Sequence, residues 1–156
     1  MANYYGFTRT NYFAVKDVKK FRKLMEKCLG AEDEIHIFES DVGTSDIVRF
    51  AFGCYGCIAG IPYNFDIDED VNVLPADNVE DEDLDIEHFY KTLQDLLLDG
   101  EAIIITEVGY EKLRYLIGIS VVITCSEISV VNLHDASLAE ARSLLRNPSY
   151  TTKLVY

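Results

Sequence analysis

The chain has 156 residues, 49% of them hydrophobic, which suffices for one domain with its own core over residues 1–156. It carries 27 Asp and Glu against 14 Lys and Arg, a net charge of −13 that disfavours binding to free nucleic acid or anionic membranes. There is no apolar run of membrane-helix length and no signal-peptide pattern near the N-terminus, so we expect a cytoplasmic protein.

The first thirty residues predict a strand followed by a helix. Residues 11–15 (NYFAV) are aromatic and β-branched, as is typical of strands. Asp17 is a suitable N-cap, and the apolar residues after it recur at helical spacing until Gly30. The opposite face of this helix is basic.

The next thirty residues predict a hairpin and a bend. Residues 34–39 alternate polar and apolar side chains, which predicts a half-buried strand. A turn at 41–45 connects it to a second strand at 47–52. Three glycines and a proline within 53–62 predict a bend or an irregular strand.

The segment 63–84, here called the acidic segment, separates the two halves of the chain. It contains apolar residues such as Val73 and Leu74, so we expect it to lie on the body of the domain. A helix from about 85 to 99 follows, with apolar side chains on one face and Gly100 at its end.

The last third predicts three strands at 102–108, 113–124 and 128–133. Their short connections favour an antiparallel meander, with the strongly apolar middle strand placed centrally. Ser137 and Glu140 form a capping-box pattern that predicts a third helix, and 151–156 predict an edge strand.

The predicted fold is therefore α+β, a mixed or antiparallel sheet packed by three helices and loosely ferredoxin-like in its first half. The order is β-α-β-β, acidic segment, α-β-β-β-α-β. The apolar strands and the edge strand at the C-terminus allow a homodimer.

Acidic residues are concentrated in one stretch. Residues 31–99 hold nineteen acidic and two basic residues, a balance of −17, whereas residues 1–30 hold seven basic and two acidic residues, a balance of +5. Carboxylates two residues apart on an extended chain share a face at about the spacing of DNA phosphates. The partner-binding candidates are Asp66, Asp68, Glu69, Asp70, Glu80, Asp81, Glu82, Asp83, Asp85 and Glu87.

The basic helix offers a second hypothesis. Its cations could contact phosphate while N-terminal aromatic rings stack on bases, with the acidic segment as an autoinhibitory cover. The candidates are Arg9, Lys19, Lys20, Arg22, Lys23, Tyr4, Tyr5 and Tyr12. Pairing of this helix with the acidic segment is the alternative that the opposite charges favour.

Metal and thiol chemistry are weaker alternatives. Asp66, Asp68 and Asp70 begin like a calcium loop, but Val71 and Asp77 stand where the loop needs Gly and Glu. Cys54 and Cys57 form a lone C-x-x-C without a second pair for zinc. We predict no metal, no cofactor and no catalysis, and a divalent-metal site remains the third hypothesis.

The opening NYYGFTRTNYF and the basic helix after Val15–Lys16–Asp17 are the basis of a resemblance. Over about the first thirty residues the chain resembles small uncharacterised proteins carried by phages and plasmids of Gram-positive bacteria. Small acidic proteins of such elements include anti-CRISPR and antirestriction inhibitors, some of which imitate DNA. The resemblance implies a non-enzymatic inhibitor, acting in a bacterial host cell, of a basic nucleic-acid-binding protein such as a CRISPR effector or restriction enzyme.

Overall fold

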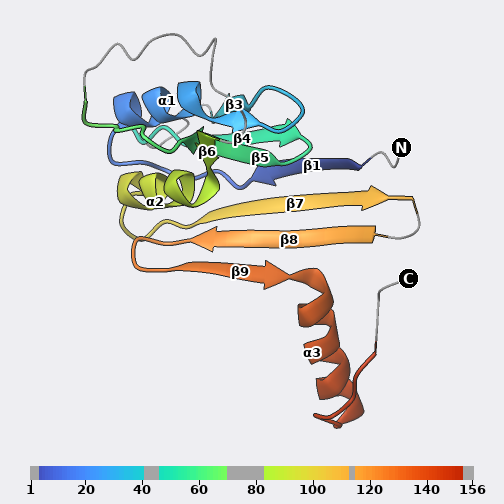
Figure 1. Cartoon of the computed structure of the whole chain (residues 1–156). Coiled ribbons are helices and arrows are strands. Elements are labelled where there is room, and N and C mark those ends of the chain that lie inside the picture. Colours follow the sequence, from blue (N-terminus) through green and yellow to red (C-terminus); the bar gives the residue numbers. More distant parts are fainter. Residues whose placement is uncertain (1–3, 41–45, 70–82, 113–114, 153–156) are drawn as a thin grey trace.

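The computed structural model describes residues 4–40, 46–69, 83–112 and 115–152 (Figure 1). They form an α+β fold, as predicted. The helices are α1 (Val18–Lys27), α2 (Ile86–Leu96) and α3 (Leu133–Leu145). The strands are β1 (Tyr5–Thr10), β2 (Leu29–Gly30), β3 (His36–Glu39), β4 (Phe50–Tyr55), β5 (Ile58–Pro62), β6 (Leu84–Asp85), β7 (Ile103–Glu111), β8 (Tyr115–Ile123) and β9 (Ile128–Asn132).

The main sheet has six strands in the order β3-β4-β1-β7-β8-β9, and all neighbours are antiparallel. Its first four strands, with α1 and α2 as connections, have the β-α-β-β-α-β order of a ferredoxin-like unit. Strands β8 and β9 extend this sheet, and α3 follows them. A small sheet, β2-β5-β6, lies beside the unit.

The first two helices begin as their sequences predict. Asp17 caps α1 by accepting a hydrogen bond from the Lys20 N–H at 3.0 Å. Asp85 caps α2 in the same way, accepting from the His88 N–H at 3.0 Å. A side-chain acceptor satisfies one of the free N–H groups of a helix's first turn, which fixes where each helix starts.

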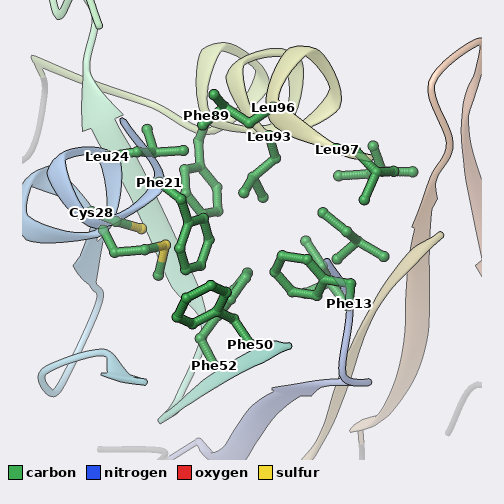
Figure 2. Close-up of a cluster of buried hydrophobic side chains, with 14 of the residues drawn as sticks. Phe13, Phe21, Leu24, Cys28, Phe50, Phe52, Phe89, Leu93, Leu96 and Leu97 are labelled. Carbon is green, nitrogen blue, oxygen red and sulfur yellow. The ribbon is translucent and has the colours of Figure 1, made fainter. Parts of the chain in front are cut away.

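The core lies between these two helices and one face of the main sheet. Figure 2 shows Phe21 and Leu24 of α1 and Phe89 and Leu93 of α2 directed toward one another and toward the sheet. The largest fully buried side chains of this cluster are Phe13, Phe21, Phe50, Phe52, Phe89, Leu24, Ile61, Leu93, Leu97, Ile103 and Ile123. The apolar helical spacing in the sequence therefore predicted the buried faces of α1 and α2.

The glycine-rich segment contains the predicted bend: β4 of the main sheet ends at Tyr55, and after Gly56 and Cys57 the chain continues as β5 of the small sheet. Gly56, at φ +74°, lies in this bend, and Gly60 has φ +122°. A Cβ on Gly60 would lie 2.6 Å from the backbone of Asp85, so only glycine lets β5 and β6 approach this closely.

The predicted strand at residues 11–15 is wrong. Tyr5–Thr10 forms the strand instead, whereas Phe13 and Val15 make single bridges to Phe50 and Leu97. The polarity of β1 explains the error. Its buried side chains are Thr8 and Thr10. The Thr8 hydroxyl donates a hydrogen bond to the Gly56 carbonyl at 2.9 Å, and the Thr10 hydroxyl accepts one from the Phe52 N–H at 2.9 Å. Satisfied threonines can be buried, although their polarity hides the strand pattern.

The predicted hairpin is confirmed, but its strands are displaced. They span His36–Glu39 and Phe50–Tyr55, and the turn predicted at 41–45 lies outside the described residues. The first strand is exposed along its length and not half-buried, because it forms the edge of the sheet.

The C-terminal meander is confirmed as antiparallel, but β8 is next to the last strand and not central. The capping box at Ser137 is wrong. Asn132 caps α3 by accepting from the His134 N–H at 2.9 Å, and Ser137 lies inside the helix. Thr151 and Thr152 are not in a strand, and the rest of the predicted edge strand lies outside the described residues.

Helix α3 has none of its residues buried. Its predicted apolar face is exposed or half-buried: Leu144, for example, is 75% exposed. Figure 1 shows α3 running from the end of β9 away from α1 and α2. It therefore adds no buried residue to the core.

Candidate functional surfaces

The acidic candidates lie partly outside the described residues. Asp70, Glu80, Asp81 and Glu82 fall there, and the structure describes Asp66, Asp68, Glu69, Asp83, Asp85 and Glu87. The described candidates therefore flank the centre of the acidic segment, where it leaves β5 and where it enters α2.

The first flank contacts the basic helix. The Lys20 ammonium lies 2.5 Å from an Asp68 carboxylate oxygen, and this hydrogen bond lowers the pKa of Asp68. The Lys23 ammonium donates to the backbone carbonyls of Ile67 and Glu69 at 3.0 and 2.6 Å. The predicted pairing of the basic helix with the acidic segment is thus present at its first residues. We call this set of interactions the lysine clamp.

Within the clamp, Asp66 accepts a hydrogen bond from the Asp68 N–H at 2.8 Å, a turn that places both carboxylates on one short loop. A lysine ammonium at Asp68 competes directly with any cation that this loop could bind. Among the described residues, no three His, Cys, Asp or Glu side chains are grouped as metal ligands would be.

The second flank supports helix α2. Asp85 is its N-cap, and Glu87 lies in its first turn, where a carboxylate interacts favourably with the helix dipole. The Asp83 carbonyl accepts from the Tyr63 N–H at 2.9 Å, which ties this flank to the end of β5. Asp85 and Glu87 therefore have structural roles, while Asp83 keeps an exposed position.

Other cations of α1 and its surroundings are also engaged. Arg22 pairs with Glu39 of β3 at 2.5 Å, and Lys16 pairs with Asp99 at 3.5 Å. Lys19 is exposed and takes part in none of the ion pairs that the structure describes. Of the helix cations predicted for nucleic acid, Lys20 and Arg22 are therefore paired with carboxylates of the same chain, and Lys23 is held by backbone carbonyls.

The three N-terminal tyrosines do not form one cluster. The Tyr4 hydroxyl donates to Glu107 at 2.8 Å, and burial with this carboxylate raises its pKa. Tyr5 points to the opposite face of the sheet, in a ring contact with Tyr110 at 5.8 Å. Tyr12 lies beyond the end of β1. Of the three predicted tyrosines, Tyr5 is the one that shares a face of the sheet with Arg9.

That surface is the side of the main sheet that α1 and α2 leave uncovered, here called the open sheet face. The strand registers place Phe7 beside Tyr55 and Val108, and Arg9 beside Gly53 and Thr106. Alternate residues of a strand point to the same face. The face comprises His36, Phe38, Gly53, Tyr55, Tyr5, Phe7, Arg9, Ile104, Thr106, Val108, Tyr110, Leu116, Gly118, Ser120, Val122, Ser129 and Val131.

The open sheet face is aromatic and apolar. Tyr5, Phe7, Tyr55 and Tyr110 are each more than half exposed, and Leu116 is 79% exposed. The Arg9 guanidinium lies over the Phe38 ring at 3.9 Å, so its charge is held against an aromatic face. A chain with 27 carboxylates places none on the described residues of this face.

A groove of about 900 Å³ runs over this face to the start of α3. Its floor includes Phe7, Tyr55 and Gly118, and its wall includes Leu133 and His134. The Leu133 side chain lies against Gly118, where a Cβ would come within 2.8 Å of it. The His134 Nδ1 atom is buried and has no hydrogen-bond partner among the described residues.

The open sheet face was not among the surfaces predicted from the sequence. The sequence did contain a strand pattern there, because Tyr5, Phe7 and Arg9 alternate with Gly6, Thr8 and Thr10. In this strand the large side chains face solvent and the small ones face the core, the reverse of the usual arrangement.

The cysteines of the C-x-x-C lie at the β4–β5 turn. Burial raises the pKa of Cys54 to about 11, and burial followed by the nearby Glu107 raises the pKa of Cys57. Thiols with raised pKa values stay protonated near neutral pH, which disfavours thiolate chemistry.

A scan of family models and searches of curated proteins and of solved structures found no match to this chain. No described helix is long and apolar enough to cross a membrane.

Proposed function

We propose that this chain is a non-catalytic binding protein that inhibits a basic nucleic-acid-binding protein by presenting carboxylates in place of DNA phosphates. The observation that carries the proposal is the pairing of cations in and beside α1. Lys20 and Arg22 of α1, and Lys16 just before it, are held by carboxylates of the same chain, so these three offer little positive charge to a partner. The net charge of −13 then attracts basic surfaces of other molecules.

Two features support the acidic segment as the contact region. The lysine clamp fixes its first residues to α1, and Asp85 fixes its last residue to α2. A charged segment anchored at both ends loses less conformational entropy on binding than a free tail would. The partner would be a CRISPR effector or a restriction enzyme, in which a cationic channel receives DNA.

Capture of partners from a bacterial lysate at low and high salt is the test. The acidic segment should retain a DNA- or RNA-handling enzyme that elutes as salt rises, because exposed ion pairs are screened. The triple variant Asp81→Asn, Glu82→Gln, Asp83→Asn should weaken this capture and its salt dependence. A matched triple variant outside the segment, Asp95→Asn, Glu127→Gln, Glu140→Gln, removes the same charge and should retain the partner. Equal affinity for the target in both triple variants contradicts the proposal.

One observation favours a second candidate, a nucleic-acid-binding module inhibited by its acidic segment. Tyr5, Phe7 and Tyr55 stand on an exposed sheet near Arg9, and single-stranded RNA is bound by aromatic rings on sheets of this kind. The lysine clamp lies on the other side of the sheet, so the acidic segment would inhibit by engaging Lys20 and Lys23 and by repelling phosphate, and not by covering the rings.

Deletion of residues 66–82 tests the second candidate. It should create binding of a fluorescent single-stranded oligonucleotide that the full chain lacks, and Phe7→Ala should abolish it. Absence of binding in the deleted chain, verified as folded by circular dichroism, excludes this candidate.

A further inference from the structure

We propose that a second copy of this chain covers the open sheet face, with α3 of each copy lying in the groove of the other. This inference is independent of the proposed inhibitor function, because it concerns the side of the sheet opposite the helices and their lysine clamp, and it competes with the second candidate, which uses the same face. In each copy, the exposed leucines of α3 would pack into the groove of the other copy. That groove is lined by Phe7, Tyr55, Leu116 and Leu133.

The low charge of the open sheet face and of the C-terminal extension favours a second copy of the chain as the partner. Two chains of −13 repel each other unless their contact surfaces are almost uncharged. Among Lys, Arg, His, Asp and Glu, the described open sheet face contains Arg9 and His36. Residues 115–150 hold three acidic residues, Glu127, Asp135 and Glu140, and two basic ones, Arg142 and Arg146, a balance of −1. Most of the negative charge therefore stays on the parts of both copies that point away from the contact.

Helix α3 requires a partner of some kind. It has thirteen residues, and an isolated helix of this length is marginal in water. None of its residues is buried, and Leu144 and Leu145 are 75% and 58% exposed. The groove begins at the first turn of α3 itself, so a two-fold axis near Leu133 would bring each helix beside the other groove.

The surface is large enough for a stable contact. The four half-exposed rings of Tyr5, Phe7, Tyr55 and Tyr110 present on the order of 450 Å², taking about 200 Å² per full aromatic side chain. That alone is about the largest apolar patch of a typical monomer. Leu116, Leu133 and the α3 leucines extend it toward the roughly 800 Å² per partner of a standard interface.

Nucleic acid fits this face less well. A groove for single strands follows the phosphates with several cations. Here the face offers one arginine, already stacked on Phe38, and much of its wall is aliphatic. Bases on this face would also leave the leucines of α3 in water.

The test is the mass of the full chain in solution, measured by sedimentation and light scattering between about 1 and 100 µM. We expect a dimer, twice the 17.7 kDa of the chain. Tyr55→Asp and Leu144→Asp should each raise the dimer dissociation constant at least about tenfold, since each places two charges in the contact. Both side chains are mostly exposed, so circular dichroism should show folded variants.

Tyr63→Asp is the matched control. Tyr63 is 66% exposed against 67% for Tyr55, but it follows β5 and lies outside the open sheet face. It should leave the dimer unchanged. A monomer at 100 µM overturns the proposal, and so does a dimer that Tyr55→Asp and Leu144→Asp leave intact. Binding of a single-stranded oligonucleotide by a monomeric chain, lost in Tyr55→Asp, would assign this face to nucleic acid instead.

Discussion

The helix-covered body and the C-terminal extension of this protein use similar sequence patterns with different results. Helix α2 and helix α3 both have apolar residues at helical spacing and an N-cap with a side-chain acceptor. In α2 this spacing buries Phe89, Leu93 and Leu96, whereas in α3 it buries nothing. An amphipathic pattern therefore indicates that a helix packs against another surface, but it does not show whether that surface belongs to the same chain.

The sheet shows the same contrast between its two faces. The covered face buries Phe52, Ile105 and Ile123 against the helices. The open sheet face displays Phe7, Tyr55 and other large side chains to solvent. A monomer seldom exposes so many neighbouring apolar groups. We therefore infer a partner for the open sheet face and none for the covered face.

The largest expected effect is a cavity in the body. Phe52→Ala removes a fully buried ring that packs edge-on against Phe13 and Phe89, at centroid distances of 6.0 Å in both cases. We expect a loss of about 3–5 kcal/mol in the free energy of unfolding, measured by urea denaturation. A loss below about 1 kcal/mol would mean that the core is not packed as described.

Equivalent caps in the two regions should differ in their effect. Asp17→Ala removes the cap of a packed helix and should lower the free energy of unfolding by about 1 kcal/mol. Asn132→Ala removes the cap of α3 and should reduce helicity by circular dichroism while changing global unfolding of the monomer by only a few tenths of a kcal/mol, because α3 is not part of the core. Equal losses in global stability would contradict the division into two regions.

The half-buried Arg49–Glu101 pair of the body should respond to acid. Two hydrogen bonds from Arg49, at 2.7 and 2.8 Å, lower the pKa of Glu101, whose side chain also accepts from the Ala14 N–H. A carboxyl with a lowered folded-state pKa stabilises the fold above its unfolded pKa of about 4.3, and this stabilisation is lost as pH falls through the lower value. Thermal unfolding of Glu101→Gln should therefore depend less on pH below about pH 4.3 than that of the parent.

The smallest effect is expected in the extension. Leu144→Ala should change the unfolding free energy by no more than about 0.5 kcal/mol at concentrations where the chain is monomeric, because its side chain is mostly exposed. The same substitution should weaken the dimer proposed above. A large loss of stability in the monomer would show that α3 packs on its own body.

The amino-acid pattern alone was enough to predict the α+β class, the starts of α1 and α2, the faces they bury and the antiparallel meander. These features depend on local signals: caps, apolar spacing and short connections. It also predicted the attraction between the basic helix and the acidic segment, which the Lys20–Asp68 pair confirms at the first residues of that segment. Attraction between long runs of opposite charge can be predicted from a sequence, because it does not depend on which individual residues pair.

The position of each strand in the sheet and the identity of the uncovered surface follow from long-range packing, which local patterns do not specify. Strand β1 was missed because its inward threonines are satisfied by Gly56 and Phe52, residues more than forty positions away. The open sheet face joins side chains from β1, β4, β7 and β8, and pairing register, which a single sequence does not specify, brings them together. The exposed α3 likewise follows from where the sheet extends past its helices, a matter of packing and not of propensity.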